Sequence, residues 1–374
     1  MHDWHHDTMQ LAWVGSSAFV IALALVPFLR KPAIQIGLVD HPAGRKRHEG
    51  SIPLTGGLAM FLAFVVSLLL GIGLWTDNAL LGLLLGMATL LAVGILDDLL
   101  DLRALLKLAV QVAVSLGIVL GTGLEITHLG QVFGPAYGMV GLGFFSIPFT
   151  VLCMVFMINA INMLDGMDGL AGGAGVIILA MLGLLGWLAG VETTLVGVAL
   201  ALGMATGGFL CWNMRGLLRQ RAAAFMGDAG SMMLGFAIAW LAIAIASSPG
   251  TQQTITPITV AWILLLPSMD ILAVSIRRLR QGRSPMSPDR SHLHHILQRL
   301  GVCPRVAVGL IHLGTLTAGA IGITAWSLGW PEHWLLLAAM ALMVGYTTAL
   351  LNARRLLRWR HGKNQRKLQK ACSH

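Results

Sequence analysis

Charged side chains are scarce in this sequence. Asp, Glu, Lys and Arg make up 11% of its 374 residues, whereas a soluble globular protein carries about 25%. Hydrophobic residues make up 56%, and the mean hydropathy is +0.78. So little charge excludes a water-soluble globular protein. The composition indicates an all-α polytopic membrane protein whose helices form one bundle.

Cysteine is also sparse, and its spacing carries no motif. The four cysteines show neither CxxC nor another ligand spacing: Cys153, Cys211, Cys303 and Cys372. Two lie in apolar runs, and two lie in segments that the charge pattern places in the cytoplasm, where thiols stay reduced. The pattern favours reduced structural thiols over disulfides.

The first apolar run also has little of the pattern that marks a cleavable leader. The first apolar run follows a His- and Asp-containing N-terminus instead of a basic one and lacks a small-residue cleavage site, so we expect a retained transmembrane helix. A run of about 20 apolar residues spans a bilayer. Counting such runs predicts eleven helices, at 9–29, 54–75, 79–96, 104–122, 146–162, 170–190, 193–212, 229–247, 255–276, 304–325 and 332–351.

One side of the predicted bundle has no basic residue. With the N-terminus in the periplasm, all 25 Lys and Arg residues fall in or beside the connections 30–53, 97–103, 163–169, 213–228 and 277–303 and the tail from 352. The positive-inside rule then places these segments and the C-terminus in the cytoplasm. We expect a bundle over 1–353 and a basic tail over 354–374 that lies against anionic lipid and does not bind nucleic acid. The outer loop 123–145 is expected to form a small hairpin.

Carboxylates gather on the predicted cytoplasmic side in three separate segments. One is NAINMLDGMDGL at 159–170, whose polar residues recur every third position and so share one helix face. The others are the ILDD end of the third span and the FMGDAGS entry to the eighth. Oxygen ligands of this kind suit a hard cation such as Mg²⁺. The residues concerned are Asn159, Asn162, Asp165, Asp168, Asp97, Asp98 and Asp228.

Each segment by itself also has a simpler interpretation. Asp97 and Asp98 could end a solvated helix with Arg103 or Lys107 as counter-charge, and Asp228 could cap its own helix. Three cytoplasmic segments that each offer a carboxylate at the membrane edge favour a shared site instead.

Basic and histidine side chains face the same predicted side. Those of interest are Arg290, His292, His294 and His295 in the loop 277–303, and Arg45, Lys46, Arg47 and His48 in the first inner loop. They can donate charge-assisted hydrogen bonds to phosphate, although the arginines also obey the positive-inside rule and the histidines could form a polar turn. No cysteine or third ligand spacing supports a zinc site. The combination predicts a site for a metal-bridged polyphosphate with a lipid as second substrate.

Asp270 is the carboxylate placed deepest in a predicted span. It precedes Arg277 by seven residues, which puts it roughly 10 Å into the ninth helix. A carboxylate in the membrane is a functional candidate, and pairing with Arg277 or Arg278 is the alternative. The sequence leaves both interpretations open.

Several motifs in order resemble one family: RKRHEGSIPLTGG, the LDD pair with a following Asp, NAINMLDGMDGL, FMGDAGS, LPSMDILAVSIRR and SPDRSHLHH. The chain resembles the polyprenyl-phosphate N-acetylhexosamine-1-phosphate transferases, and within them the bacterial undecaprenyl-phosphate N-acetylglucosamine branch. The resemblance implies a multi-pass enzyme of the bacterial inner membrane. It would transfer GlcNAc-1-phosphate from UDP-GlcNAc to undecaprenyl phosphate with Mg²⁺ or Mn²⁺, release UMP, and feed a surface glycan such as O-antigen.

The resemblance also implies roles for individual residues. Asp228 and Asn162 would hold the metal and pyrophosphate, and Asp97, with Asp98 beside it, would orient or deprotonate the lipid phosphate. Asp165 and Asp168 would position the nucleotide sugar. The sugar and its phosphates would contact Arg290, His292, His294 and His295, and more weakly Arg45, Lys46, Arg47 and His48.

Several alternatives stay open at this point. Another UDP-HexNAc or UDP-MurNAc-pentapeptide could be the donor. The lipid phosphate could attack the sugar-bearing phosphorus directly, which we favour, or through a covalent aspartyl intermediate. A transporter or flippase is disfavoured, because the ionisable residues cluster at one interface and the two halves show no repeat. The sequence leaves a homodimer open.

Overall fold

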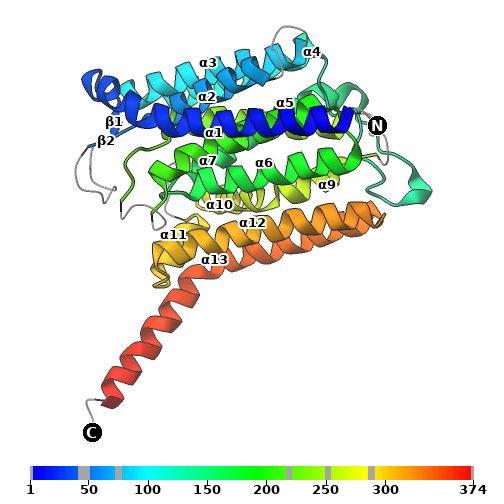
Figure 1. The fold of residues 1–374 in the computed structure, drawn as a ribbon. Helices are drawn as coiled ribbons and strands as arrows, with labels where there is room; N and C mark the ends of the chain where they lie inside the picture. Colours follow the sequence, from blue (N-terminus) through cyan, green and yellow to red (C-terminus); the bar gives the residue numbers. More distant parts are fainter. Residues whose placement is uncertain are drawn as a thin grey trace.

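The computed structural model describes residues 3–40, 51–71, 78–215, 221–248, 254–284 and 291–371, with side chains described from residue 8 to residue 352 of these ranges. Helices dominate and run side by side in one bundle (Figure 1). This is the arrangement expected of apolar runs in a bilayer, where each backbone polar group must be satisfied within its own segment.

The helices coincide with the apolar runs. Within the described ranges, nine helices are long and apolar enough to cross a membrane, which agrees with a polytopic membrane protein. Every expected range overlaps a helix, but α2 has only 16 residues, so the count of eleven spans stays a prediction. The main helices are α1 (Asp3–Gln35), α2 (Gly56–Gly71), α3 (Asn78–Leu100), α4 (Ala104–Thr122), α5 (Ser146–Leu164), α6 (Leu170–Ala189), α7 (Thr193–Asn213), α8 (Gly227–Ser247), α9 (Pro257–Ile263), α10 (Leu265–Arg280), α11 (Leu293–Arg299), α12 (Pro304–Ser327) and α13 (Glu332–Ala371).

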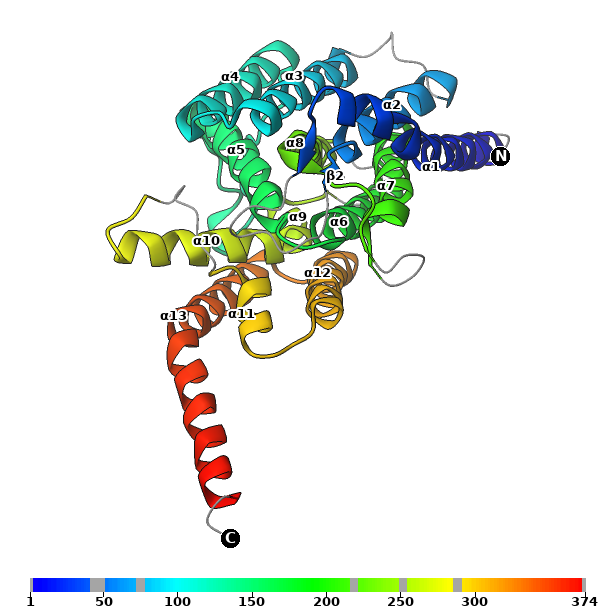
Figure 2. The same ribbon diagram turned by 90° about the vertical axis from the view of Figure 1, so that its left-hand side faces the viewer.

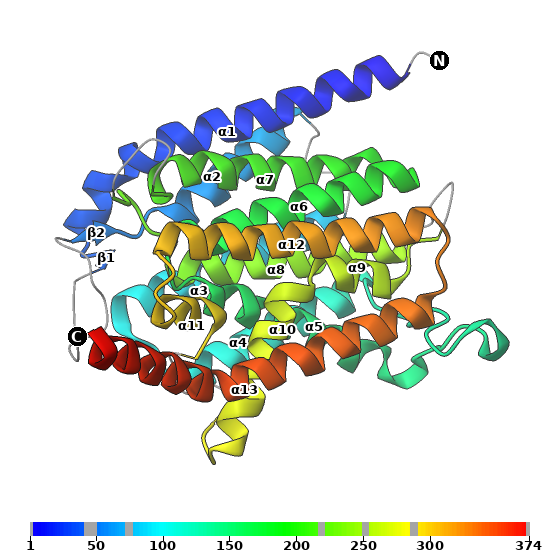
Figure 3. The ribbon, with the colours of Figure 1, turned by 90° about the horizontal axis from the view of Figure 1, so that it is seen from below.

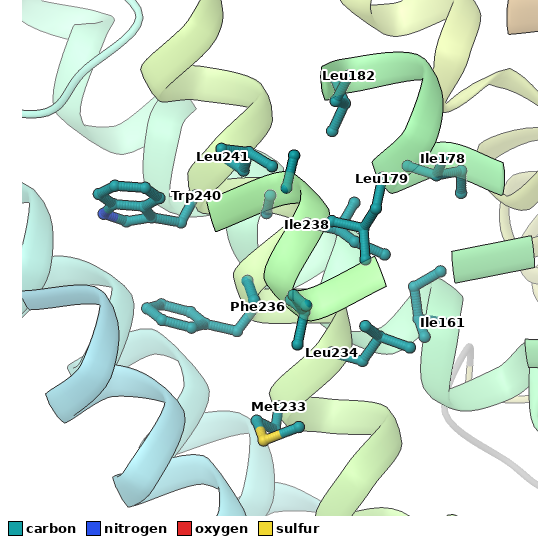
Figure 4. Close-up of a cluster of buried hydrophobic side chains, with 14 of the residues drawn as sticks. Ile161, Ile178, Leu179, Leu182, Met233, Leu234, Phe236, Ile238, Trp240 and Leu241 are labelled. Carbon is teal, nitrogen blue, oxygen red and sulfur yellow. The ribbon is translucent and has the colours of Figure 1, made fainter. Parts of the chain in front are cut away.

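Helix α8 forms the centre of the bundle. Each of its residues from Ala229 to Ile245 is buried, and Figure 2 shows it enclosed by α2, α3, α5, α6 and α7. Its large side chains, among them Phe236 and Trp240, pack in a cluster with residues of α5 and α6 (Figure 4). Because neighbouring helices cover all its faces, the start of α8 is held in a fixed position.

Glycines allow α2 and α3 to approach the first turn of α8. A Cβ at Gly57 would lie 2.5 Å from the Gly230 nitrogen, and one at Gly94 would collide with the Ala229 backbone. Small residues permit this kind of close contact between membrane helices. The approach brings the carboxylates at the end of α3 to the start of α8.

The ninth expected span, 255–276, is not one straight helix. It breaks at Leu264 into α9 and α10, which make an angle of 79°. Pro267 explains the break, because its ring clashes with the carbonyl four residues earlier, that of Ile263, and it has no N–H to donate. Figures 2 and 3 show α10 running across the direction of the other helices.

Small β elements lie at the two ends of the bundle. The strands β1 (Val39–Asp40) and β2 (Ile52–Pro53) pair antiparallel at one end. At the other, near the N-terminus (Figure 1), the Leu129 N–H donates to the Val140 carbonyl at 2.8 Å beside a bridge between His128 and Gly141. The hairpin expected in the loop 123–145 is therefore confirmed.

Helix α13 continues past the expected end of the bundle. It runs unbroken to Ala371, and its C-terminal part extends away from the other helices (Figure 1). The division between a bundle over 1–353 and a tail over 354–374 therefore falls within one helix, and the separate role of the tail stays a prediction.

Candidate active site

Four helix ends meet around one ammonium group. The Lys107 Nζ at the start of α4 lies 2.6 Å from Asp97 Oδ2 at the end of α3 and 3.2 Å from Asp228 Oδ2 at the start of α8. From the end of α5, Asn162 Nδ2 donates to Asp228 Oδ1 at 2.8 Å and to Ser231 Oγ at 2.9 Å. The three carboxylate-bearing segments singled out in the sequence thus lie in contact.

Asp97 is a buried carboxylate. It is 6% exposed, and its Oδ1 accepts a hydrogen bond from the Leu102 N–H at 2.8 Å. This bond shapes the tight connection between α3 and α4, and with it the position of Lys107. Of the two counter-charges considered, Lys107 is the one that pairs with Asp97, and the interpretation of Asp97 as a solvated helix end is wrong.

Asp98 points to a different place from its neighbour. Its two oxygens accept the backbone N–H groups of Asp228 and Ala229, at 3.0 and 3.3 Å. The first N–H groups of a helix have no partner within it and attract negative charge, so Asp98 of α3 caps α8. The alternative in which Asp228 caps its own helix is wrong, because Asp228 is the second residue of α8.

Gly227 makes this cap sterically feasible. It has a φ of +73°, and a Cβ there would lie 2.5 Å from Asp98 Oδ2. A side chain would therefore meet both a strained backbone and the capping carboxylate. The backbone conformation and the close approach of Asp98 therefore explain why glycine precedes the aspartate in FMGD.

A second polar layer lies one helical turn deeper. Asn159 Nδ2 donates to Gln111 Oε1 at 2.6 Å, and Gln111 Nε2 contacts Met232 Sδ at 3.4 Å. Gln111 follows Lys107 by one turn, and Asn159 precedes Asn162 by about one turn. The layer fixes how α4, α5 and α8 are rotated against one another. Sequence reasoning missed Gln111, although a polar amide inside an apolar span was a usable signal.

Asp165 and Asp168 do not continue the helical row of Asn159 and Asn162, as their spacing predicted. Helix α5 ends at Leu164, and the glycine-rich turn that follows carries the two aspartates. Asp165 is exposed, and Asp168 forms an ion pair with Arg215. We call residues 165–169 the aspartate turn.

The aspartate turn is tied to the segment before Asp228. The Gly169 N–H donates to Asn213 Oδ1 at 2.7 Å, and Asn213 Nδ2 donates to the Ala224 carbonyl at 2.9 Å. Asn213 is buried, so this link is shielded from water. Through Asn213, the turn that carries Asp165 and Asp168 is held beside the entry to α8.

Residues 292–295, which we call the histidine segment, pack on the same turn. His294 is 1% exposed, and neither ring nitrogen has a hydrogen-bond partner within the described structure. Its ring lies against Gly166, where a Cβ would collide with it. Burial, with the nearby His295, lowers the pKa of the His294 imidazole to about 3, so the ring is neutral near pH 7. The described residues thus leave a buried imidazole beside the aspartate turn without a hydrogen-bond partner, which is uncommon in a folded protein.

The other predicted site residues are placed as follows. His292 is buried and pairs with Asp270, with Nδ1 and Oδ2 2.8 Å apart. The His295 ring packs against that of His294, with centroids 4.2 Å apart. The remaining predicted site residues lie outside the described residues: Arg45, Lys46, Arg47, His48 and Arg290.

The first inner loop ends close to Asp228. The Phe225 N–H donates to the Pro53 carbonyl, and the Gly56 N–H donates to the Phe225 carbonyl, both at 3.0 Å. These bonds join the residues that follow the loop to the segment that leads into α8. The described end of this loop therefore lies next to the segment that carries Asp228 into its contact with Lys107.

The donor set around Asp228 fits a hard cation better than zinc. In the described part of the chain, no three His, Cys, Asp or Glu residues are grouped as metal ligands. Mg²⁺ needs no such cage, because it commonly binds one or two carboxylates together with water and substrate phosphates. The Asp228 side chain is 37% exposed, so it can reach such a cation, with the Asn162 amide beside it.

The chain is similar in sequence to known proteins over most of its length. The family described as "Glycosyl transferase family 4" matches residues 80–246, the part that carries Asp97, Asn162 and Asp228. The chain is 35% identical over 327 residues to the undecaprenyl-phosphate alpha-N-acetylglucosaminyl 1-phosphate transferase of Salmonella typhi, with 87% of each chain covered. It is 36% identical to that of Escherichia coli K12 over 326 residues, again 87% of each chain. With that of Pasteurella multocida it shares 35% over 343 residues, 91% of this chain and 94% of the relative.

Proposed function

This chain belongs to the family of the undecaprenyl-phosphate α-N-acetylglucosaminyl 1-phosphate transferases, and we propose on that basis that it transfers GlcNAc-1-phosphate from UDP-GlcNAc to undecaprenyl phosphate and releases UMP. The observation that carries the proposal is the meeting of Asp97, Lys107 and Asp228 at one end of the bundle. It lies within the segment that the family match covers. A charged site at the membrane edge suits a reaction between a soluble nucleotide sugar and a lipid phosphate.

In phosphoryl transfer the protein mainly positions the reacting groups and neutralises their charge. Mg²⁺ or Mn²⁺, held by Asp228 and Asn162, would neutralise the pyrophosphate of the donor. Asp97 orients the lipid phosphate or accepts its proton. Lys107 keeps the carboxylates of Asp97 and Asp228 together against their mutual repulsion.

The contacts of the aspartates support direct attack. Both Asp98 oxygens accept backbone N–H groups of α8, and the Asp97 oxygens are bonded to the Leu102 N–H and to Lys107. An aspartyl intermediate would replace one of these hydrogen bonds by a covalent bond to phosphorus, whereas direct attack leaves them in place. An oxygen of the lipid phosphate instead forms a bond to the β-phosphorus of UDP-GlcNAc. The bond from that phosphorus to the oxygen shared with the α-phosphate breaks, and UMP leaves with the electron pair.

The sugar-nucleotide end of the donor lies against the aspartate turn and the histidine segment. Asp165 is exposed there, and the unpaired ring nitrogens of His294 border Gly166. A buried group that gains its hydrogen bond only from the substrate rejects donors that do not supply one. Arg290 and the segment Arg45–His48 contribute further phosphate contacts in this proposal.

The cellular setting follows from the same chemistry. The matched relatives named above are bacterial, and the positive-inside rule predicts that the connections with Arg103, Arg215 and Arg221 face the cytoplasm. The enzyme therefore resides in the inner membrane with this site in the cytoplasm, where UDP-sugars are made. Its lipid-linked product supplies a cell-surface glycan such as O-antigen.

An assay with purified components tests the proposal. The protein in detergent is incubated with UDP-GlcNAc, undecaprenyl phosphate and Mg²⁺, and UMP and the lipid product are followed. Parallel reactions replace the donor with UDP-GalNAc or UDP-MurNAc-pentapeptide. We expect UMP release to require UDP-GlcNAc, the lipid and the metal together. Release with another donor alone would change the assigned substrate, and no release with any donor would refute the transferase assignment.

A further inference from the structure

Asp270 is a buried carboxylate whose partners come from two distant parts of the chain, residues 292–293 at the start of α11 and Tyr346 in α13. It is 5% exposed. Its Oδ1 accepts from the Tyr346 hydroxyl of α13 at 2.6 Å and from the Leu293 N–H of α11 at 3.0 Å, and its Oδ2 lies 2.8 Å from His292 Nδ1. Burying a carboxylate is costly unless its oxygens are hydrogen-bonded. These hydrogen bonds dock α11 and α13 onto α10.

The Asp270 contact selects one tautomer of His292. A carboxylate accepts, so Nδ1 of His292 must donate, and in the neutral imidazole this leaves Nε2 as an acceptor. Arg278 Nη2, which can only donate, lies 3.5 Å from that Nε2. In the series of contacts from Tyr346 through Asp270 and His292 to Arg278, each contact therefore joins a donor to an acceptor.

His292 connects this series of hydrogen bonds to the candidate active site. Its ring stacks on that of His294, with centroids 5.8 Å apart and planes inclined by 10°. His294 in turn packs on Gly166 of the aspartate turn. A displacement of the His292 ring would therefore also move the His294 ring and its unpaired nitrogens.

We propose that Asp270 and Tyr346 are positioning residues for the sugar-nucleotide end of the site. They hold the histidine segment in one tautomer and one orientation against the aspartate turn. The last membrane helix thereby contributes to donor binding without touching the donor. This inference rests on the proposed function, but its structural part can be tested without turnover.

Asp270→Asn tests the tautomer with little change in shape. Two donors, Tyr346 and the Leu293 N–H, share one oxygen of Asp270, so the amide oxygen takes that place and the amide NH₂ faces His292. Nδ1 must then accept, Nε2 must donate, and this donor faces the donor Arg278. Tyr346→Phe removes a single hydroxyl and leaves the other Asp270 contacts in place.

Two control variants make the same chemical changes elsewhere. Glu332→Gln removes a carboxylate that accepts the Gln131 N–H at 2.7 Å, at the opposite end of the membrane part of α13. Tyr137→Phe alters the other of the two tyrosines in the chain, which is 79% exposed in the outer loop. Neither residue belongs to the site, so both variants should behave as wild type.

Steady-state kinetics give the first readout. We expect Asp270→Asn to raise the KM for UDP-GlcNAc about tenfold or more, as for loss of a hydrogen bond to a charged group. Tyr346→Phe should shift it less in the same direction, and the KM for undecaprenyl phosphate should stay constant. A loss of kcat with both KM values unchanged would show a merely structural role and overturn the proposal, as would unchanged kinetics. If Asp270→Asn does not fold, the KM of Tyr346→Phe for UDP-GlcNAc tests the proposal by the same criteria.

Histidine modification gives a readout that needs no substrate. Diethyl pyrocarbonate labelling, located by mass spectrometry, should spare His292 and His294 in the wild type, where they are 5% and 1% exposed. Labelling should be faster in Asp270→Asn and Tyr346→Phe but not in the controls, and equal rates in all five proteins would refute the positioning role. If the wild type turns over no UDP-sugar while this protection depends on Asp270, the proposed function fails and the positioning of the histidine segment stands.

Discussion

Removing the ammonium group of Lys107 should disable the candidate site without unfolding the bundle. In Lys107→Gln, the carboxylates of Asp97 and Asp228 lose the cation that lies between them. The glutamine amide is shorter than the lysine and carries no charge, so it does not restore both contacts. The two aspartates then repel each other, and the entry to α8 loses its link to α4.

The magnitude follows from the burial of the three side chains. Those of Asp97, Lys107 and Asp228 are 4%, 24% and 37% exposed. A hydrogen bond to a charged group contributes about 1.5–3 kcal/mol, and the value falls where water screens the pair. The contact of Lys107 with Asp97 therefore contributes nearly all of this free energy, and the contact with Asp228 contributes part of it. A total of about 3 kcal/mol corresponds to a loss of about a hundredfold in kcat/KM.

The assay is UMP release under the conditions given above, with the amount of folded protein measured by size-exclusion chromatography in detergent. Arg103→Gln is the matched control, because it removes an exposed cation four residues earlier, at the same helix end. Lys107→Arg keeps the charge and should retain more activity than Lys107→Gln. Wild-type kcat/KM in Lys107→Gln, or an equal loss in Arg103→Gln, would refute the assignment of this cluster as the active site.

Three further predictions follow from the same contacts. Asp228→Asn and Asp97→Asn should each abolish turnover while membrane insertion, checked by fractionation, is unchanged; normal turnover in either would remove its assigned role. Chelation of divalent metal should stop UMP release, and Mg²⁺ or Mn²⁺ should restore it; full activity in EDTA would contradict the metal assignment. Gly94→Ala should lower stability by about 1–3 kcal/mol, seen as a lower thermal midpoint in detergent, because its Cβ meets the Ala229 backbone. Gly117→Ala, on a helix face with nothing within 4 Å, is its control and should not lower the midpoint.

The membrane helices were predictable because their cause is local. An apolar run in a bilayer must satisfy its backbone within itself, so hydropathy alone marks where helices lie. The same reasoning failed at α9 and α10, where composition gives one apolar run but Pro267 interrupts it. The direction taken after the break is set by the helices that α10 crosses, which hydropathy does not describe.

The contacts of Asp97, Asp98 and Asp270 were less predictable than the presence of carboxylates at these positions. Asp97 and Asp98 are neighbours in the sequence, yet one faces Lys107 and the other caps α8. This division depends on how α3 is rotated against α8, which the contact at Gly94 sets. Asp270 shows the same limit, because the sequence offered Arg277 or Arg278 as partners, and the structure pairs it with His292 and Tyr346.

By itself the sequence determined that this protein is a helical membrane protein, where its apolar runs lie, and which motifs carry its carboxylates and histidines. Each of these depends on residues close together in the chain. Only the tertiary structure decided which two carboxylates contact the Lys107 ammonium group, which one caps α8, and how α13 reaches the histidine segment. Those contacts join residues from separate helices, and they exist only once packing has fixed the rotation and the depth of each helix.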